Sequence, residues 1–250
     1  MTDRLSWRHA ARTDIGRVRA HNEDSLLAAP ETGYFAVADG LGGHVAGEVA
    51  SELAVRRVDE ELGRVPPNDL PERIHSVLHE AIRSANEAIL EEVDRDPGLA
   101  GMGTTLTILA FFADRRYAIG HVGDSRAYLL RDGELRRLTH DHTVVQELVD
   151  RGRLTDEQAR LHPRSSVLTR ALGIERDVVA DYLEGAARAG DRFLLATDGL
   201  TAMVEEAMLR PLLETGPDPG AAAEALVDAA CRAGGTDNIT VIVVELDSAA

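Results

Sequence analysis

The chain has 250 residues, with 27 Lys and Arg against 43 Asp and Glu, so its formal net charge is −16 with neutral His. This balance disfavours a nucleic-acid binder, which needs a basic face, and it disfavours docking on an anionic membrane surface. Lys is absent, so every cation counted here is Arg. A Walker A loop, a pyridoxal Schiff base and a kinase-type strand lysine are therefore excluded, because each needs an amine.

The composition is that of a globular protein, with 44% hydrophobic and 28% charged residues. At this length we expect one domain over residues 1–250. The single cysteine, Cys231, cannot form an internal disulfide or a Cys-based zinc cluster, and we interpret it as a small helix hydrophobe. No apolar run reaches about 18 residues and the N-terminus has no apolar signal region, which predicts a soluble cytoplasmic protein.

The first third of the chain predicts one strand and two helices. Residues 34–38 are a short apolar run typical of a buried strand, and residues 45–62 favour a helix. Residues 70–93 predict the clearest helix, because their apolar residues fall on one face at 3.6-residue spacing. Asp69 is placed to cap this helix, with Glu72 completing a capping box.

The remaining chain predicts a meander followed by further helices and strands. Strands are expected over residues 104–112, 116–122, 125–130, 134–138, 191–197 and 238–246. Short helical pieces are expected within residues 142–172, and longer helices over 204–215 and 219–233. Successive strands joined by short turns, such as the hairpin signal at 131–133, indicate antiparallel pairing. Helices between blocks of strands then favour a layered α+β architecture.

Acidic residues recur where the expected strands begin or end. Asp39 and Asp198 each follow an apolar run and precede Gly, Asp124 follows a third strand, and Asp237 precedes the last one. A single Asp-Gly pair is ordinary turn chemistry, but four such positions together with the pair at 23–24 are more than turns explain. Clustered carboxylates raise one another's pKa unless positive charge lies among them.

That positive charge can come from Arg or from a metal ion. Carboxylate oxygens suit hard cations such as Mg²⁺ and Mn²⁺, and with one Cys and no His-x-x-x-His pattern the usual zinc sites are not expected. Two such ions sharing a carboxylate can hold a water as hydroxide near neutral pH, which attacks phosphorus in line. Phosphate-monoester hydrolysis, one of the slowest uncatalysed reactions, fits this chemistry.

Six motifs in fixed order carry a resemblance to a known family. They are Gly16-x-Val18-Arg19-x-x-Asn22-Glu23-Asp24, Asp39-Gly40-Leu41-Gly42-Gly43-His44, Gly103-Thr104-Thr105, Val122-Gly123-Asp124-Ser125-Arg126, Thr197-Asp198-Gly199-Leu200 and Gly235-Thr236-Asp237-Asn238. From about residue 8 to residue 246, the chain resembles the metal-dependent Ser/Thr protein phosphatases, the protein phosphatase 2C family (PPM), in its short bacterial form. The resemblance implies a four-layer α-β-β-α sandwich, in which a central antiparallel β-sandwich is flanked by α-helices.

The resemblance also implies a metal site at one end of the sandwich. Its expected members are Glu23, Asp24, Asp39, Gly40, Asp124, Asp198 and Asp237. Two central Mn²⁺ or Mg²⁺ ions would be bound by Asp39, Asp198 and Asp237, with Asp39 bridging and the Gly40 carbonyl as a further ligand. Glu23 and Asp24 would act largely through waters, and Asp124 with Asp198 would match a third, weaker site.

Two catalytic assignments and one segment complete what the resemblance implies. Arg19 would bind the substrate phosphate, for which a guanidinium fork is well shaped. Animal members carry a His directly after the Asp-Gly pair, where this chain has Leu41; His44 lies three residues on and is a candidate general acid. Residues 139–173 match the flap segment, which lies near the active site of bacterial members.

The resulting prediction is a Ser/Thr protein phosphatase that opposes bacterial Ser/Thr kinases. Its expected partners are phosphorylated proteins, including such kinases, with no nucleic acid and no membrane, and we expect a monomer. Two alternatives are a non-catalytic phosphoprotein-binding relative, which would lose one of the three central aspartates, and a phosphatase acting on anti-sigma-factor antagonists. A dinucleotide-binding interpretation of residues 40–42 fails, because the third motif glycine would fall at Val45.

Overall fold

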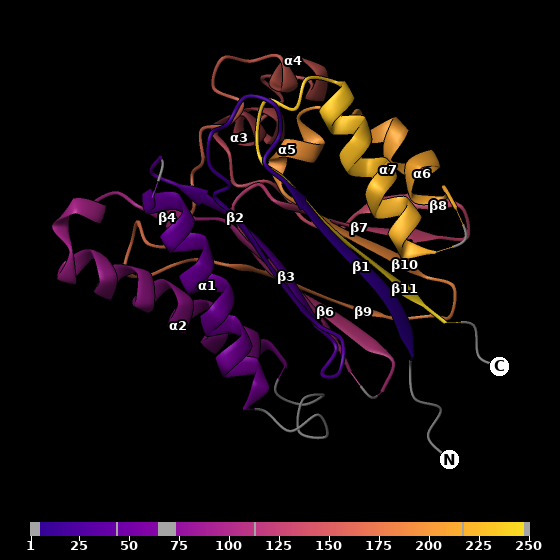
Figure 1. The fold of residues 1–250 in the computed structure, drawn as a ribbon, viewed down its shortest axis with the longest axis horizontal. Helices are drawn as coiled ribbons and strands as arrows, with labels where there is room; N and C mark the ends of the chain where they lie inside the picture. Colours follow the sequence, from indigo (N-terminus) through magenta and orange to yellow (C-terminus); the bar gives the residue numbers. More distant parts are fainter. Residues whose placement is uncertain (1–5, 44, 65–73, 113, 217, 248–250) are drawn as a thin grey trace.

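The computed structural model describes residues 6–43, 45–64, 74–112, 114–216 and 218–247, and it contains two antiparallel sheets that pack face to face (Figure 1). One sheet has the order β1 (Trp7–Asp14), β11 (Ile239–Leu246), β10 (Arg192–Ala196), β7 (Arg126–Arg131) and β8 (Glu134–Arg137). The other has the order β2 (Asp24–Ala29), β3 (Tyr34–Leu41), β5 (Leu106–Phe111), β6 (Arg116–Val122) and β9 (Asp181–Ala186), with β4 (Gly103–Thr104) paired to β3.

Helices cover the outer face of each sheet. α1 (Val45–Gly63) and α2 (Ile74–Arg95) lie together beside the sheet that contains β3, while α6 (Glu206–Leu213) and α7 (Pro219–Arg232) lie beside the other sheet (Figure 1). The short elements η1 (Pro97–Leu99), α3 (Val144–Asp150), α4 (Asp156–Arg160) and α5 (Asp198–Thr201) complete the described helices. The predicted α-β-β-α sandwich is therefore confirmed.

Three apolar layers hold the four structural layers together. Along β3, Phe35 and Val37 belong to the core between the sheets, whereas Tyr34, Ala36 and Ala38 belong to the core under α1 and α2. This alternation follows the two-residue period of a strand. Because both faces of β3 are buried, its sequence is a continuous apolar run, which explains why the apolar run identified it.

Helix α2 shows why the clearest predicted helix forms where it does. Leu78, Ile82 and Ile89 lie on one face at helical spacing and are almost fully buried. They pack towards β6, where Gly120 allows a close approach: a Cβ at this position would lie 2.9 Å from Cδ1 of Ile82. The helix is confirmed from residue 74 onward, and the proposed capping residues at 69 and 72 lie outside the described residues.

The sequence did not predict three strands, and the reason is their position. β1, β2 and β9 each form an edge of their sheet and consist mainly of half-buried or exposed residues. An edge strand with a partly solvated face carries a weak hydrophobic pattern. The predicted strand over 104–112 also divides at Thr105 into β4 and β5, and the helix predicted from 204 begins at Glu206.

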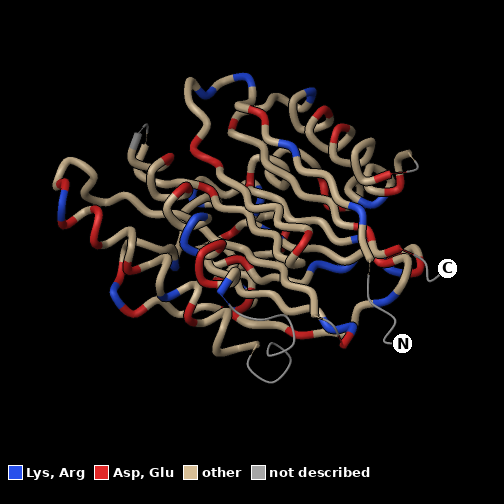
Figure 2. Tube along the Cα trace, turned by 60° about the horizontal axis from the view of Figure 1, so that its bottom comes forward, with Lys and Arg blue, Asp and Glu red and all other residues tan. Residues whose placement is uncertain are grey.

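The charged residues are concentrated on helices and loops, and the interior strands are largely uncharged (Figure 2). Many arginines are neutralised locally; on α2, for example, Arg83 pairs with Glu80 and Glu87 one turn away. In the part of the chain that the structure describes, no helix is long and apolar enough to cross a membrane.

The inter-sheet core makes a prediction about stability. Phe193 is buried at its centre, with ring centroids 5.2 Å from Phe111 and 4.9 Å from Tyr117 in edge-to-face geometry. Phe193→Ala should lower the free energy of unfolding by about 3–5 kcal/mol, because it leaves a cavity between two sheets that cannot collapse. Urea denaturation measures this loss, with the exposed Leu161→Ala as control. A loss below about 1 kcal/mol would contradict this account of the core.

Candidate active site

One cavity, of about 200 Å³, brings together acidic residues from both sheets. It is lined by Arg19, Glu23, Asp39, Gly40, Leu41, Asp124, Ser166, Leu168, Asp198, Asp237 and Asn238. These residues come from strand ends and adjoining loops, as the sequence pattern predicts. Of the predicted site residues, Asp24 does not line the cavity, and His44 lies outside the described residues.

Buried threonine hydroxyls and backbone bonds fix the position of Asp39. Its backbone N–H donates to Oγ1 of Thr105 at 2.9 Å, and its carbonyl accepts from Oγ1 of Thr104 at 2.9 Å. The backbone N–H of Thr105 donates to the same carbonyl at 2.9 Å. The sequence indicates these threonines only as strand formers, but the structure gives them the further task of holding the end of β3 in register.

A close backbone approach explains the glycine after Asp39. A Cβ on Gly40 would lie 2.1 Å from the carbonyl oxygen of Gly47 and 2.7 Å from that of Glu23. The N–H of Gly40 donates to that same Glu23 carbonyl at 3.1 Å. Any side chain here would therefore push β3 away from α1 and from the chain segment that carries Glu23.

Asn238 ties the loop between β1 and β2 to the start of β11 at the rim of the cavity. Its side-chain oxygen accepts from the backbone N–H of Glu23 at 2.8 Å, and its amide donates to the carbonyls of Ile15 and His21 at 3.0 and 2.9 Å. Its backbone N–H donates to Oδ1 of Asp237 at 2.9 Å. Sequence reasoning assigned no role to Asn238; the available signal was an amide residue directly after a motif aspartate.

The carboxylates lie close enough to disfavour one another's ionisation. Burial raises the pKa of Asp24 to about 7, and repulsion from Asp198 adds to the effect. Burial also raises the pKa of Asp39 well above its ordinary value, followed by repulsion from Asp24 and Asp198. The pKa values of Asp124 and Asp198 are raised in the same direction, first by burial and then by a neighbouring carboxylate.

Two of the carboxylate oxygens have no hydrogen-bond partner among the described residues. They are Oδ1 of Asp24 and Oδ1 of Asp198, and both are buried. The other oxygen of Asp24 accepts from Oγ1 of Thr197 at 2.8 Å. Of these two residues, Asp198 lines the cavity, and a buried carboxylate oxygen without a partner is a donor that a hard divalent cation prefers.

Arg19 supplies the positive charge that the cavity contains. Its Nη2 atom lies 2.6 Å from Oδ2 of Asp237, and about half of the Arg19 side chain is exposed. The other oxygen of Asp237, Oδ1, accepts from the backbone N–H of Asn238. Within the described ranges, no three His, Cys, Asp or Glu side chains are grouped closely enough to hold a metal ion as they stand.

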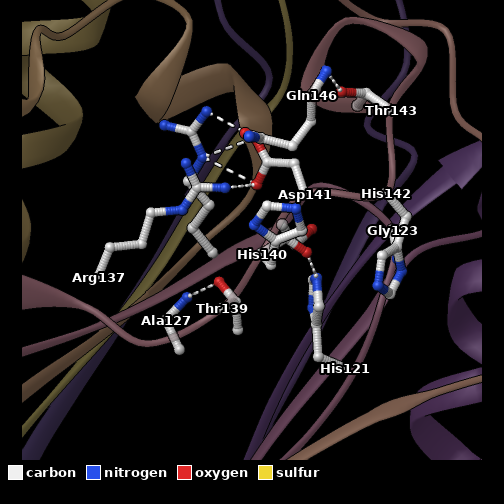
Figure 3. Close-up of polar contacts among 12 residues, drawn as sticks. His121, Gly123, Ala127, Arg137, Thr139, His140, Asp141, His142, Thr143 and Gln146 are labelled. Carbon is white, nitrogen blue, oxygen red and sulfur yellow. Dashed lines mark hydrogen bonds and ion pairs between the residues drawn. The ribbon is translucent and has the colours of Figure 1, made fainter. Parts of the chain in front are cut away.

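The base of the predicted flap is fastened to the loop that carries Asp124 (Figure 3). The carboxylate of Asp141 is buried between Arg126, which donates to it at 2.7 Å, and Arg137. The next residue, His142, accepts from the backbone N–H of Gly123 at its Nδ1 atom, at 3.1 Å. The first residues of the flap are therefore fixed to Gly123, which directly precedes Asp124.

Comparisons with known proteins agree on one class. The family model described as Protein phosphatase 2C matches residues 16–229. The serine/threonine protein phosphatase PstP of Mycobacterium tuberculosis is 45% identical over 243 residues, covering 97% of this chain and 45% of PstP. The serine/threonine phosphatase stp of Listeria monocytogenes is 40% identical over 239 residues, covering 94% of both chains.

Solved structures give the same result. The crystal structure of the PstP catalytic domain in complex with two manganese ions has a TM-score of 0.88 at 43% identity, covering 98% of this chain and all of that one. Stp1 from Staphylococcus aureus has a TM-score of 0.90 at 27% identity, covering 99% and 98%. The relatives and the solved structures named here are all serine/threonine phosphatases. The chain belongs to the protein phosphatase 2C family, and it spans about 45% of the length of the mycobacterial relative PstP.

A buried histidine near this site makes a prediction about pH. Burial, above all, lowers the pKa of His121 to about 3, whereas an unfolded histidine titrates near 6.5. The stabilising contribution of neutral His121 is therefore complete above about pH 6.5 and is lost as the pH falls towards 3. Between pH 7 and 5, the wild-type chain should lose about 2 kcal/mol of unfolding free energy more than a His121→Gln variant.

Urea denaturation of both proteins at the two pH values measures this difference. The carboxylates of the cavity are present in both chains, so their titration cancels in the comparison. Equal pH dependence in the two proteins would contradict this prediction, because it would show that folding does not lower the pKa of His121.

Proposed function

We propose that this chain is a serine/threonine protein phosphatase that hydrolyses phosphoserine and phosphothreonine monoesters on proteins, using Mn²⁺ or Mg²⁺. The observation that carries the proposal is the convergence of Asp39, Asp198, Asp237 and Arg19 on one cavity. Membership of the protein phosphatase 2C family and the names of the relatives support it.

The cavity contains the oxygen donors that two divalent ions need, although the described side chains are not grouped closely enough to hold an ion as they stand. Asp39, Asp198 and Asp237 would hold them together with the carbonyl of Gly40, and the unpartnered Oδ1 of Asp198 is available for this purpose. Such ions, when bound, neutralise the developing charge and lower the pKa of a water molecule enough for it to react with phosphorus. The manganese ions named in the PstP complex support the choice of cation.

The other acidic residues, Glu23, Asp24 and Asp124, would contribute to metal binding less directly than the three central aspartates. Glu23 lines the cavity, whereas Asp24 lies behind it, opposite Asp39 in the register of β2 and β3, so we assign Asp24 an indirect role. Asp124 and Asp198 both line the cavity and are the candidates for a third, weaker ion. His44 remains a predicted general acid.

Arg19 is placed to receive the phosphate. Its guanidinium group is held by Asp237, and about half of the Arg19 side chain is exposed. A planar guanidinium can donate two parallel hydrogen bonds to phosphate oxygens, which fixes both the position and the orientation of the phosphorus. The ion pair with Asp237 prepares this geometry before substrate arrives.

The substrate would also contact the flap. Ser166 and Leu168, from the segment 139–173, line the same cavity as the carboxylates. We therefore propose that residues 1–250 act as one catalytic domain whose flap contacts the phosphoprotein beside the phosphorylated residue. The presence of all three central aspartates in the cavity disfavours a non-catalytic role, and the relatives' names do not support an anti-sigma-antagonist phosphatase.

The proposed setting is the cytoplasm, where the chain would act as a monomer on phosphorylated proteins, including Ser/Thr kinases. The net charge of −16 supports the exclusion of nucleic acids and anionic membranes as partners, because like charges repel. The bacterial phosphatases named among its relatives support phosphoproteins as substrates.

Removal of the metal tests the proposed chemistry. A chelator should abolish hydrolysis of p-nitrophenyl phosphate, and added Mn²⁺ or Mg²⁺ should restore it. Asp39→Asn should lower kcat about a thousandfold, since it removes several kcal/mol of charge stabilisation. Activity that survives chelation, or a folded Asp39→Asn protein with near-normal turnover, would contradict the proposal.

Arg19→Ala tests phosphate binding separately from the metal chemistry. It should raise KM for a phosphopeptide about tenfold or more, with a smaller effect on kcat, because charge-assisted hydrogen bonds to the ground-state phosphate are lost. Arg17→Ala is the matched control: Arg17 is exposed, pairs with Asp14 at 3.0 Å and does not line the cavity. Steady-state kinetics in which both variants keep the wild-type KM would exclude this role for Arg19.

A further inference from the structure

A second, larger hollow adjoins the carboxylate cavity. Its volume is about 490 Å³, and two of its lining residues, Leu41 and Leu168, also line the cavity. Most of the lining is apolar and comes from the end of β3 and the segment 168–179. We call this hollow the apolar groove, and its apolar members are Leu41, Leu168, Ala171, Ile174, Val178 and Val179.

Two residues of the apolar groove present hydrophobic surface to solvent. Ile174 is 53% exposed and Val179 is 63% exposed. Isolated exposed hydrophobic residues are ordinary, but two that line one hollow beside a candidate active site form a contiguous apolar surface. Such a surface gains free energy when an apolar side chain covers it.

Hydrogen bonds from helix α2 fix the turn that carries Ile174. The side chain of Asn86, fully buried in α2, donates to the carbonyls of Glu175 and Arg176 at 2.9 and 3.1 Å, and it accepts from the N–H of Gly173 at 2.7 Å. A Cβ on Gly173 would lie 2.4 Å from a side-chain carbon of Ile89. The exposure of Ile174 is therefore built into the fold, because its turn is anchored on both sides.

The preceding residues are anchored equally well. Leu172 and Thr104 exchange two backbone hydrogen bonds, at 3.1 and 2.9 Å, which attach the groove to the strand that pairs with the motif around Asp39. Arg170, Glu175 and Asp177 are the charged residues that line the groove, and Arg170 is held by Asp181 at 2.9 Å. The groove and the carboxylate cavity thus share one rigid frame.

We propose that the apolar groove binds a large aliphatic or aromatic side chain of the phosphoprotein substrate, close in sequence to the phosphorylated Ser or Thr. This inference rests on the proposed phosphatase function. Continuity with the cavity selects this occupant: a phosphorylated side chain that enters beside Leu41 and Leu168 carries its neighbouring residues over the same two side chains. An extended peptide advances about 3.3–3.6 Å per residue, so positions one to three residues away can reach the groove.

Phosphothreonine peptides that differ at one flanking position provide the test. Leu is compared with Ser at each of the three positions before and after the phosphorylated residue. The wild-type chain should hydrolyse the Leu peptide with about tenfold higher kcat/KM at one of these positions, because that side chain is buried in the groove. In the Ile174→Ser/Val179→Ser variant the ratio should fall towards one.

Leu161→Ser is the matched control. Leu161 is 80% exposed in the flap and does not line the groove, so this variant should keep the wild-type preference. Urea denaturation of all variants confirms that they are folded. Absence of a preference at every position, or a preference that persists in the double variant, would overturn the inference.

Hydrolysis of p-nitrophenyl phosphate distinguishes failure of the groove proposal from failure of the proposed function. Wild-type hydrolysis of this small ester without any peptide preference would refute the groove proposal and leave the phosphatase function intact. No hydrolysis of either substrate would refute the phosphatase function. Light scattering tests a second copy of the chain as occupant of the groove, and a concentration-dependent dimer that the double variant abolishes would also overturn the inference.

Discussion

Repulsion among carboxylates at one end of the β-sandwich is the constraint on which the site depends. Asp39, Asp124 and Asp198 line one small cavity, where burial raises the pKa of all three and repulsion from a neighbouring carboxylate adds to each shift. Hydrogen bonds with Thr104 and Thr105 hold Asp39 in this position at the end of β3. The excess negative charge that remains is the source of the affinity for divalent cations that we propose.

Such hydrogen bonds also connect the site to the surfaces around it. Thr104 holds Asp39 through its hydroxyl and holds the groove segment through its backbone bonds to Leu172. His142, near the start of the flap, accepts a hydrogen bond from Gly123, the residue before Asp124. Phosphate chemistry and the contacts proposed for the flanking peptide thus depend on a few shared anchor points, so their geometry is set together.

Much of this arrangement could be predicted from the sequence, because strand-end aspartates followed by glycine form a local pattern. The α+β layers followed from buried strands such as β3 and from the one-sided apolar face of α2. Edge strands such as β1 were not predicted, because their residues are only partly buried and so carry a weak hydrophobic pattern. The roles of Asn238 and His142 were not predicted either, because they depend on contacts between segments far apart in the chain.

The unfolding free energy of the wild-type chain and an Asp198→Asn variant, each with and without Mn²⁺, tests the central claim most directly. Without divalent ions, Asp198→Asn should be the more stable protein, because one repelling charge is gone. Mn²⁺ at about 100 times its Kd should stabilise the wild type by about 2.7 kcal/mol per site, and the variant by clearly less. A metal-free variant less stable than the wild type, with the full response to Mn²⁺, would contradict the account.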